Sequence, residues 1–140
     1  MDDPLRQLPG YLLRRASTAM MARLHERLAP FDLRPAEASL LRLIGERAQL
    51  TQSEAGRIMG IQRANMAPLT ARLEARGLIS RLPMSGRAQA LALTGAGRAL
   101  LDQVQAAFAA QEDEIMARVP EPLRPHVRPI LLAIWGPDAE

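Results

Sequence analysis

The sequence predicts a mainly α-helical protein that carries one small β-hairpin. Three observations indicate this class. Apolar residues recur at intervals of three and four over most of the 140-residue chain, which is the period of amphipathic helices. Two short stretches past the middle of the chain instead alternate between apolar and polar residues, as strands do. The 11 prolines act mainly as boundaries between these elements.

The composition fits one folded unit. A chain of 140 residues is long enough for a single domain with a modest core, and its 48% hydrophobic content argues against disorder. Because only 3% of the residues are aromatic, that core must consist of Leu, Ala, Ile and Met. We therefore expect one domain that spans residues 1–140.

Two helices are expected before residue 48. The first runs from about Pro9 to Ala29 and is closed by Pro30. Its apolar stripe consists of Leu12, Leu13, Ala16, Ala19, Met20, Leu24 and Leu28. Pro35 suits the first position of the second helix, which runs to about Arg47 and serves as a scaffold. Its packing residues are Ala38, Leu40, Leu41, Leu43 and Ile44.

A short third helix follows. Residues 48–50 could add a very short strand to the hairpin, and Thr51 and Glu54 have the spacing of a capping box, which predicts a helix start. Gly60 stands where a left-handed C-terminal cap is least costly. This helix is therefore expected to have about two turns.

A fourth helix opens at Gln62 and Arg63 and ends at Gly77. Its inward stripe consists of Met66, Leu69 and Leu73. The polar residues expected to lie off that stripe are Gln62, Arg63, Asn65, Thr70 and Arg72. Pro68 lies inside this helix and removes one backbone donor, so we expect it to bend or loosen the helix.

The hairpin is expected to pair residues 78–82 with residues 89–93, with Ile79 and Leu91 on the packed face. Residues 83–87 form the turn and place Arg87 at or near its tip. An arginine there can enter the DNA minor groove, where the negative potential is strongest when the groove is narrow. The alternative for Arg87 is an ordinary solvated surface charge.

Helix, turn, helix and hairpin in this order predict a winged helix-turn-helix, a DNA-reading module, over about residues 33–94. Its motifs closely resemble those of the MarR family of transcription regulators. The matching residues are Leu50–Ser53, Leu73–Ile79, Gly86–Gln89 and Leu93–Gly95. These motifs span about a third of the chain, and their order and spacing are more specific than a single helix-turn-helix match. The resemblance implies an obligate homodimer whose two recognition helices read a roughly palindromic operator.

Two positions depart from the family pattern. Pro68 stands in the recognition helix where many relatives have a polar or basic residue. Ser85 and Gly86 occupy the place of the acidic residue that often precedes the arginine of the wing. Both departures bear on how this chain would contact DNA.

Two further helices are expected after the hairpin. Thr94 is a plausible N-cap for a long helix that runs to about Val119. The last helix covers about residues 123–135, and Pro129 should kink it. With the first helix they have more apolar surface than a small reading module can cover, so we expect residues 5–30 and 95–136 to pack against a second copy. An intramolecular bundle is the alternative.

The charge is concentrated on the reading module. Between Arg57 and Arg98 there are seven arginines and one acid, a net +6, whereas the whole chain carries +3. Such a basic block is typical of a protein that binds a polyanion. All 18 basic residues are arginine, which suits bidentate phosphate and guanine contacts, although genomic base composition also explains such a bias.

Several classes of function lack residue support. The chain has no cysteine, which excludes disulfides and thiol-based sensing, and His25 and His126 lie in different helices. We therefore expect no enzyme activity, no cofactor and no metal site, although the two histidines could meet across a dimer interface. With no signal peptide and no membrane-length apolar run, we expect a cytoplasmic protein without a membrane partner.

The candidate DNA contacts follow from the module. Base edges in the major groove are assigned to Gln62, Arg63 and Asn65. Phosphates are assigned to Thr70 and Arg72, with Gln52 and Ser53 supporting the approach. Arg87 is assigned to the minor groove, and Arg81 and Ser85 belong to the same candidate surface.

The family resemblance also implies a small-molecule effector, commonly an aromatic or phenolic acid, in a crevice between the dimer helices and the reading module. A carboxylate ligand requires a cation beside an apolar wall. The candidates are Arg14, Met20, Met21, His25, Phe31 and Phe108. The alternative is a core that contains several methionines, since Met fills irregular gaps.

These observations predict a dimeric, sequence-specific DNA-binding regulator of transcription, a repressor that occludes a promoter and is relieved by a small ligand. The main alternative is a winged-helix protein-interaction module without specific DNA binding, a reading that Pro68 favours. A helical metal- or ligand-dependent enzyme has almost no residue support.

Overall fold

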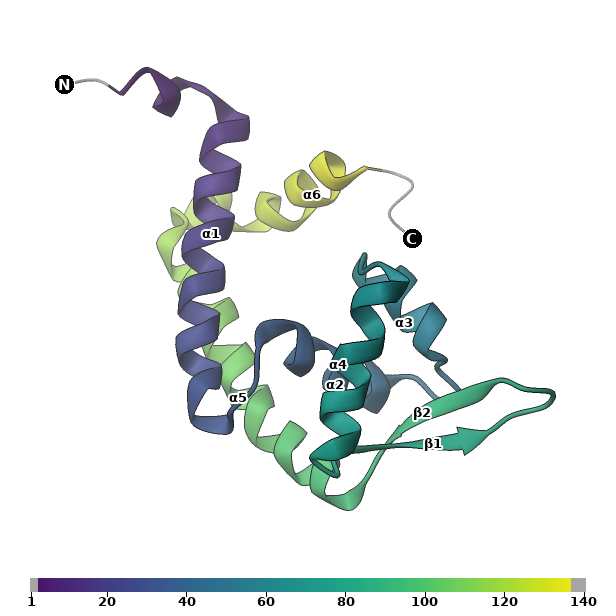
Figure 1. The fold of residues 1–140 in the computed structure, drawn as a ribbon. Helices are drawn as coiled ribbons and strands as arrows, with labels where there is room; N and C mark the ends of the chain where they lie inside the picture. Colours follow the sequence, from purple (N-terminus) through teal and green to yellow (C-terminus); the bar gives the residue numbers. More distant parts are fainter. Residues whose placement is uncertain (1–2, 137–140) are drawn as a thin grey trace.

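The structure, a computed structural model, describes residues 3–136 and is mainly α-helical with one two-stranded antiparallel hairpin, as predicted (Figure 1). Its helices are α1 (Pro9–Leu28), α2 (Pro35–Glu46), α3 (Gln52–Met59), α4 (Arg63–Ala75), α5 (Gly95–Arg118) and α6 (Arg124–Trp135). Its strands are β1 (Ile79–Pro83) and β2 (Gln89–Leu93). Short 3-10 turns lie at Pro4–Gln7 (η1), Ala29–Phe31 (η2) and Glu121–Leu123 (η3). No helix within residues 3–136 is long and apolar enough to cross a membrane.

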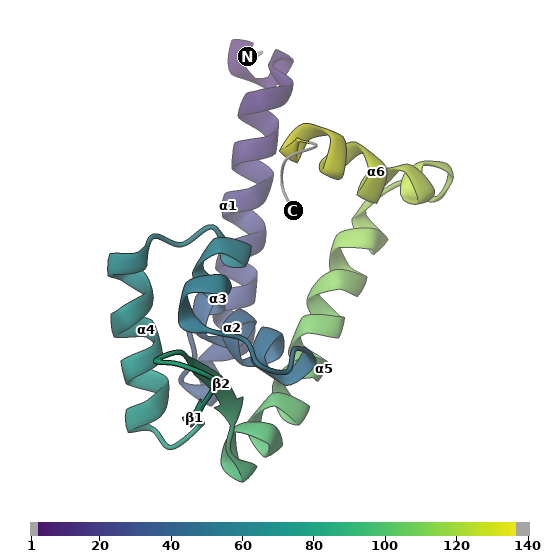
Figure 2. The same cartoon turned by 90° about the vertical axis from the view of Figure 1, so that its right-hand side faces the viewer.

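The elements form two parts that share one core. The first part consists of α2, α3, α4 and the hairpin, which extends away from the helices (Figure 1). In the second part α1 and α5 pack against each other, and α6 turns back from the end of α5 toward α1 (Figure 2). Leu28, Leu40, Leu41, Leu73 and Leu101 are fully or almost fully buried where the two parts meet, so the core is continuous.

Local capping rules place the helix boundaries. The Thr51 hydroxyl accepts a hydrogen bond from the Glu54 amide at 3.1 Å, so the predicted start of α3 is confirmed. Gly60 has φ 67° and ψ 31°, the predicted left-handed end of that helix. The Thr94 hydroxyl accepts from the Gly97 amide at 3.0 Å and starts α5. The predicted ends of these helices therefore follow from single residues.

The hairpin differs from the prediction by one residue at its first strand, since β1 runs from Ile79 to Pro83. Ile79 pairs with Leu93, and both Ile79 and Leu91 are buried as predicted. The expected strand over residues 48–50 is reduced to one bridge between Thr51 and Ala90. Gln49 has a positive φ of 59°, which turns the chain and limits the pairing to this bridge.

Pro68 does not interrupt α4, which is continuous from Arg63 to Ala75. A proline in a helix interior removes the hydrogen bond to the carbonyl four residues earlier, here that of Ala64. Both residues are exposed, so water can replace the missing donor. The expected bend stays a prediction.

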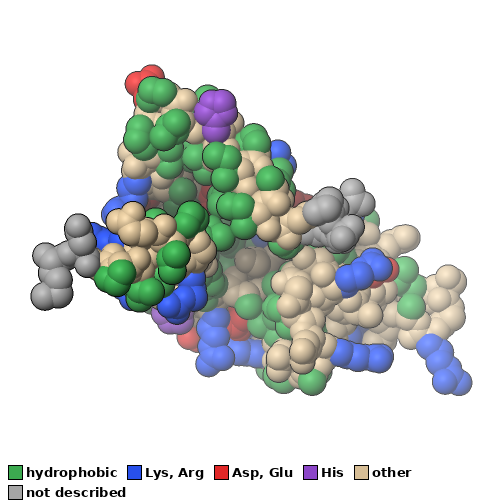
Figure 3. Space-filling view, turned by 90° about the horizontal axis from the view of Figure 1, so that it is seen from above, with side chains coloured by type: hydrophobic (Ala, Val, Ile, Leu, Met, Phe, Trp, Pro, Cys, Tyr) green, Lys and Arg blue, Asp and Glu red, His purple; other side chains and the backbone are tan. Residues whose placement is uncertain are grey.

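The predicted apolar stripe of α1 is only partly covered within this chain. Leu24 and Leu28 are buried, whereas Leu12 is 46% exposed, and Ile134 and Trp135 of α6 are 58% and 67% exposed. Seen from above, hydrophobic side chains gather on the lobe at the left of the view and on the lobe at its top (Figure 3). The structure therefore leaves an apolar surface on α1 and α6 without a covering element from residues 3–136.

Polar side chains also join α1 to α5. The buried Gln111 side-chain amide donates to the Met20 carbonyl at 2.8 Å, and the Arg27 guanidinium donates to the Gln111 side-chain oxygen at 3.2 Å. Glu114 accepts from Arg27 and lies 3.4 Å from Arg23. This hydrogen bond to Arg27 is the main reason that the pKa of Glu114 is lowered from its ordinary value of 4.5.

We expect Glu114→Gln to lower the thermal unfolding midpoint at pH 7. A carboxyl whose folded-state pKa is depressed stabilises the protein above its unfolded pKa, and this contribution is lost as the pH falls through the folded pKa. The difference in midpoint between wild type and variant should therefore shrink below about pH 4.5. Glu112→Gln removes the same charge from an exposed position of α5 and serves as the control. A difference for Glu114→Gln that is constant with pH would contradict the expectation.

Candidate nucleic-acid interface

A groove of about 450 Å³ opens between the start of α3, the start of α4 and the hairpin. Five of the residues predicted to contact DNA line it, namely Gln52, Ser53, Arg63, Arg81 and Arg87. The caps explain this convergence, because Thr51 starts α3 and Gln62 starts α4 at the same edge of the module. Gln89, at the start of β2, also lines the groove. The prediction missed it, although its outward position in the strand alternation could have indicated it.

The first turn of α4 is open to solvent. Gln62 is its N-cap, and Gln62, Arg63 and Asn65 are all exposed. Within residues 3–136, no carboxylate forms an ion pair with Arg63. These three side chains thus have donors and acceptors available for a partner outside the chain.

The wing tip is equally accessible. Its turn is closed by a hydrogen bond from the Met84 amide to the Ala88 carbonyl at 3.0 Å, and Gly86 adopts a φ of 79° that a side chain would strain. Ser85 and Arg87 are exposed on either side of it. The guanidinium of Arg87 is therefore presented on a short, tight loop.

Thr70 does not lie on this surface, and the expected phosphate contact is wrong. Its side chain is fully buried, and its hydroxyl donates to the Gln52 side-chain oxygen at 2.9 Å. Thr70 stands one turn after Met66, so it shares the inward stripe with that residue. The prediction grouped Thr70 with the outward-facing residues because it is polar. Its angular position on the helix instead places it on the buried side.

Arg81 completes a polar network beneath the groove. Its guanidinium donates to the Gln52 side-chain oxygen at 2.7 Å and to the Thr70 hydroxyl at 3.3 Å. It also pairs with Glu74 of α4 at 2.8 Å. The network joins α3, α4 and β1, so it holds the hairpin at a set angle to both helices. A DNA contact of Arg81 stays a prediction.

Arg72 is also occupied within the protein. Its Nε lies 2.7 Å from the Glu37 carboxylate, and its Nη2 lies 3.4 Å from that of Asp32. Both partners belong to elements that precede the reading helices. Its predicted phosphate contact is untested, but the side chain already has a structural role.

The six effector candidates differ in exposure and in surroundings. Arg14 is exposed and lies over the Tyr11 ring, with its guanidinium carbon 5.6 Å from the ring centre. Met21 and His25 are exposed, whereas Met20, Phe31 and Phe108 are half-buried. Arg42 lies 5.5 Å over the ring of Phe108, which puts a cation beside an apolar wall that the prediction did not include.

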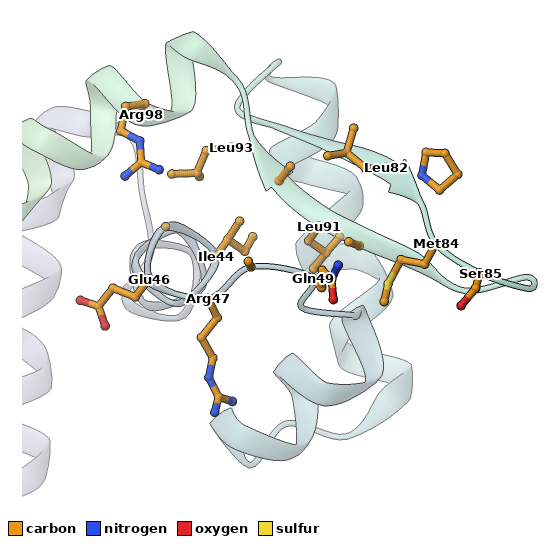
Figure 4. A pocket seen from close by; sticks show the side chains of 15 residues that line it. Ile44, Glu46, Arg47, Gln49, Leu82, Met84, Ser85, Leu91, Leu93 and Arg98 are labelled. Carbon is orange, nitrogen blue, oxygen red and sulfur yellow. The ribbon is translucent and has the colours of Figure 1, made fainter.

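A second groove, of about 750 Å³, lies between the end of α2, the hairpin and the start of α5 (Figure 4). Leu82, Met84, Leu91 and Leu93 reach it from the hairpin, and Arg98 reaches it from α5. None of the six effector candidates lines either groove. Within residues 3–136, no group of three or more His, Cys, Asp or Glu side chains is arranged to hold a metal ion.

Comparisons with known proteins identify the module. A sequence model described as the MarR family matches residues 31–88. The fold matches the transcriptional repressor CouR bound to a 23-mer DNA duplex, with 32% identity and a TM-score of 0.86, over 93% of this chain and 94% of that one. The chain belongs to the MarR family.

Other solved structures agree with this MarR-family assignment. CouR from Rhodococcus jostii RHA1 bound to p-coumaroyl-CoA is 28% identical, with a TM-score of 0.83 and 98% of each chain covered. A MarR-family transcriptional regulator from Rhodococcus sp. RHA1 is 26% identical, with a TM-score of 0.85, over 97% of this chain and 99% of that one. A comparison with curated protein sequences finds no match. The family assignment thus rests on the sequence model and on solved structures that cover nearly the whole chain.

Proposed function

We propose that this MarR-family protein is a dimeric, sequence-specific DNA-binding repressor whose operator binding is relieved by a small organic acid. The observation that carries the proposal is the groove between the start of α3, the start of α4 and the hairpin. Arg63 and Arg87 line this groove together with Gln52 and Ser53. A repressor whose structure was solved on a DNA duplex shares this fold at 32% identity.

The geometry suggests a division of tasks. Gln62, Arg63 and Asn65 at the open end of α4 would contact base edges in the major groove, since bidentate side chains distinguish base pairs there. Arg87 at the wing tip would enter the adjacent minor groove. The net charge of +6 between Arg57 and Arg98 would supply the phosphate attraction that is independent of sequence.

A homodimer would use the uncovered apolar surface of α1 and α6. Residues 5–30 and 95–136 supply this surface, whose exposed members include Leu8, Leu12 and Ile130. Contiguous apolar surface is costly in water, and a second copy is the simplest cover. A two-fold dimer would also present two recognition helices to half-sites about 34 Å apart.

The proposed effector is an aromatic or phenolic acid, free or carried on coenzyme A. Two MarR-family structures support this class, since CouR was solved with p-coumaroyl-CoA at 30% identity and the Mycobacterium tuberculosis protein Rv2887 with salicylic acid at 27% identity. In this chain Phe31 and Phe108 are half-buried against the core, and Arg42 lies over Phe108. These residues would supply an apolar wall with a cation beside it.

The test is fluorescence anisotropy with a duplex from upstream of the protein's own coding frame and a scrambled duplex, each at several salt concentrations. Preferential binding to the first duplex, with an affinity that falls steeply with salt, is the expected result. The complex can then be titrated with salicylate and with p-coumaroyl-CoA. Absence of binding to either duplex at low salt would favour a protein-interaction module instead.

Arg63→Ala should weaken binding to the preferred duplex by ~1–3 kcal/mol and change binding to the scrambled duplex much less. The reason is that a bidentate base contact exists only on the correct sequence. Arg87→Ala is the comparison variant, because it removes one cation at the wing tip and leaves the major-groove contacts in place, and it should lower both the affinity and the salt slope, the latter by about one. Equal losses on both duplexes for Arg63→Ala would assign that side chain to the phosphate backbone.

A further inference from the structure

The connection between α1 and α2 is bonded to the C-terminal half of the recognition helix. The Arg76 guanidinium donates to the Asp32 carbonyl at 2.6 Å and to the Phe31 carbonyl at 3.1 Å. Arg72, one turn earlier on α4, donates to the same Asp32 carbonyl at 3.3 Å. Arg72 of α4 and Arg76, the C-cap of this helix, thus converge on two consecutive carbonyls of one connection.

The backbone of that connection has an unusual conformation. Asp32 ends η2 with φ 51° and ψ 47°, the left-handed region that non-glycine residues seldom adopt. Aspartate tolerates this region better than most residues, but the conformation still persists only where its surroundings hold it. The hydrogen bonds from Arg72 and Arg76 to its carbonyl provide that support.

Glu37 fixes Arg72 from the other side. This carboxylate is 1% exposed, and one of its oxygens accepts from the Arg34 amide at 2.9 Å. Its other oxygen lies 2.7 Å from Nε of Arg72 in an ion pair whose N–H is not aligned with the oxygen, and neither atom has a hydrogen-bond partner within the described chain. A buried carboxylate requires a cation nearby, so the position of Arg72 is determined by the start of α2 as well as by Asp32.

These contacts differ from the other contacts of α4. Met66 and Leu73 pack α4 into the core beside α2, α3 and β1. The arginine contacts instead reach Phe31 and Asp32 at the end of η2, the short turn that follows α1 and precedes the reading helices. They are the polar contacts that tie the recognition helix to the end of α1.

We propose that Arg72 and Arg76 are positioning residues that fix the orientation of the recognition helix relative to α1. The inference rests on the proposed function and deepens it. In a dimer formed through α1 and α6, the two arginines set the separation of the two recognition helices, and so the spacing of the half-sites.

The test compares full-length wild type, Arg76→Gln and Arg76→Lys on the preferred duplex and on duplexes with one base pair inserted or removed between the half-sites. Wild type should show a sharp preference for one spacing. In both variants the ratio of affinities between the best and the altered spacing should fall toward one. Lysine keeps the charge that attracts DNA but lacks the planar guanidinium that reaches two carbonyls. An effect that Arg76→Gln and Arg76→Lys share therefore does not come from the loss of charge.

The matched control is Arg118→Gln, which removes one arginine and one ion pair within α5 and should keep the wild-type spacing profile. Thermal midpoints are measured on every variant, because a merely structural loss lowers the midpoint and leaves the affinity ratio unchanged. An unchanged ratio in folded Arg76→Lys and Arg76→Gln overturns the inference alone. Wild type without a preference for any duplex overturns the proposed function, and the inference with it.

Discussion

Gly97→Ala should destabilise the protein by about 3 kcal/mol, the upper end of the usual cost of overpacking, because the new methyl group has no space. A Cβ at this position would stand 2.0 Å from the carbonyl oxygen of Leu78 and 3.0 Å from its carbonyl carbon. Both atoms are backbone, and the same carbonyl accepts from the Thr94 amide at 3.1 Å, so it cannot rotate away freely. Urea unfolding followed by circular dichroism would measure the loss in the free energy of unfolding.

Gly95→Ala is the matched control in the same first turn of α5. A Cβ there would have no atom within 4 Å, and alanine is the better helix former by ~0.8–1 kcal/mol in a helix interior. We expect this variant to be as stable as wild type or slightly more stable. If Gly97→Ala unfolds at the same urea concentration as Gly95→Ala, the close approach of α5 to Leu78 is not a constraint in solution.

The contrast between these two glycines shows which parts of the fold could be predicted. Thr51, Gly60 and Thr94 act on backbone groups within a few residues, so local rules located them from the sequence. The role of Gly97 depends on a backbone segment 19 residues earlier that only the folded chain brings near. Sequence rules give no reason to distinguish Gly97 from Gly95. The element order was therefore predictable, and the close packing between elements was not.

The residues of the candidate site also fall into a group that local sequence rules predict and a group that they do not. Arg63 and Asn65 follow a predicted helix start and lie off the apolar stripe, and they are exposed as that position implies. Thr70 was misjudged because its polarity outweighed its place one turn after Met66. The partner of Arg72 is Glu37, 35 positions earlier, and periodicity cannot pair residues at that separation. Local structure thus predicts which side chains reach solvent, and tertiary contacts decide which of them are already engaged.

Arg72→Ala should lower the free energy of unfolding by about 3 kcal/mol, toward the lower end of the range for breaking a buried ion pair. The variant would leave the Glu37 carboxylate buried without its cation. Arg72 itself is 38% exposed, so water already screens part of the interaction, and this is why we expect the lower end. Urea unfolding of wild type and variant would measure the difference.

A second substitution separates the charge from the packing. Glu37→Gln keeps an oxygen that can accept from the Arg34 amide but removes the buried charge, so the double variant Glu37→Gln/Arg72→Ala should be more stable than Arg72→Ala alone. Asp32→Asn is the surface control, because asparagine tolerates the left-handed backbone of this position, and the carboxylate that it removes is 85% exposed in a pair of a kind that contributes at most about 1 kcal/mol. If the double variant is no more stable than Arg72→Ala, the instability comes from the lost packing of the Arg72 side chain and not from the unpaired carboxylate of Glu37. Glu37 would then tolerate the absence of a cation.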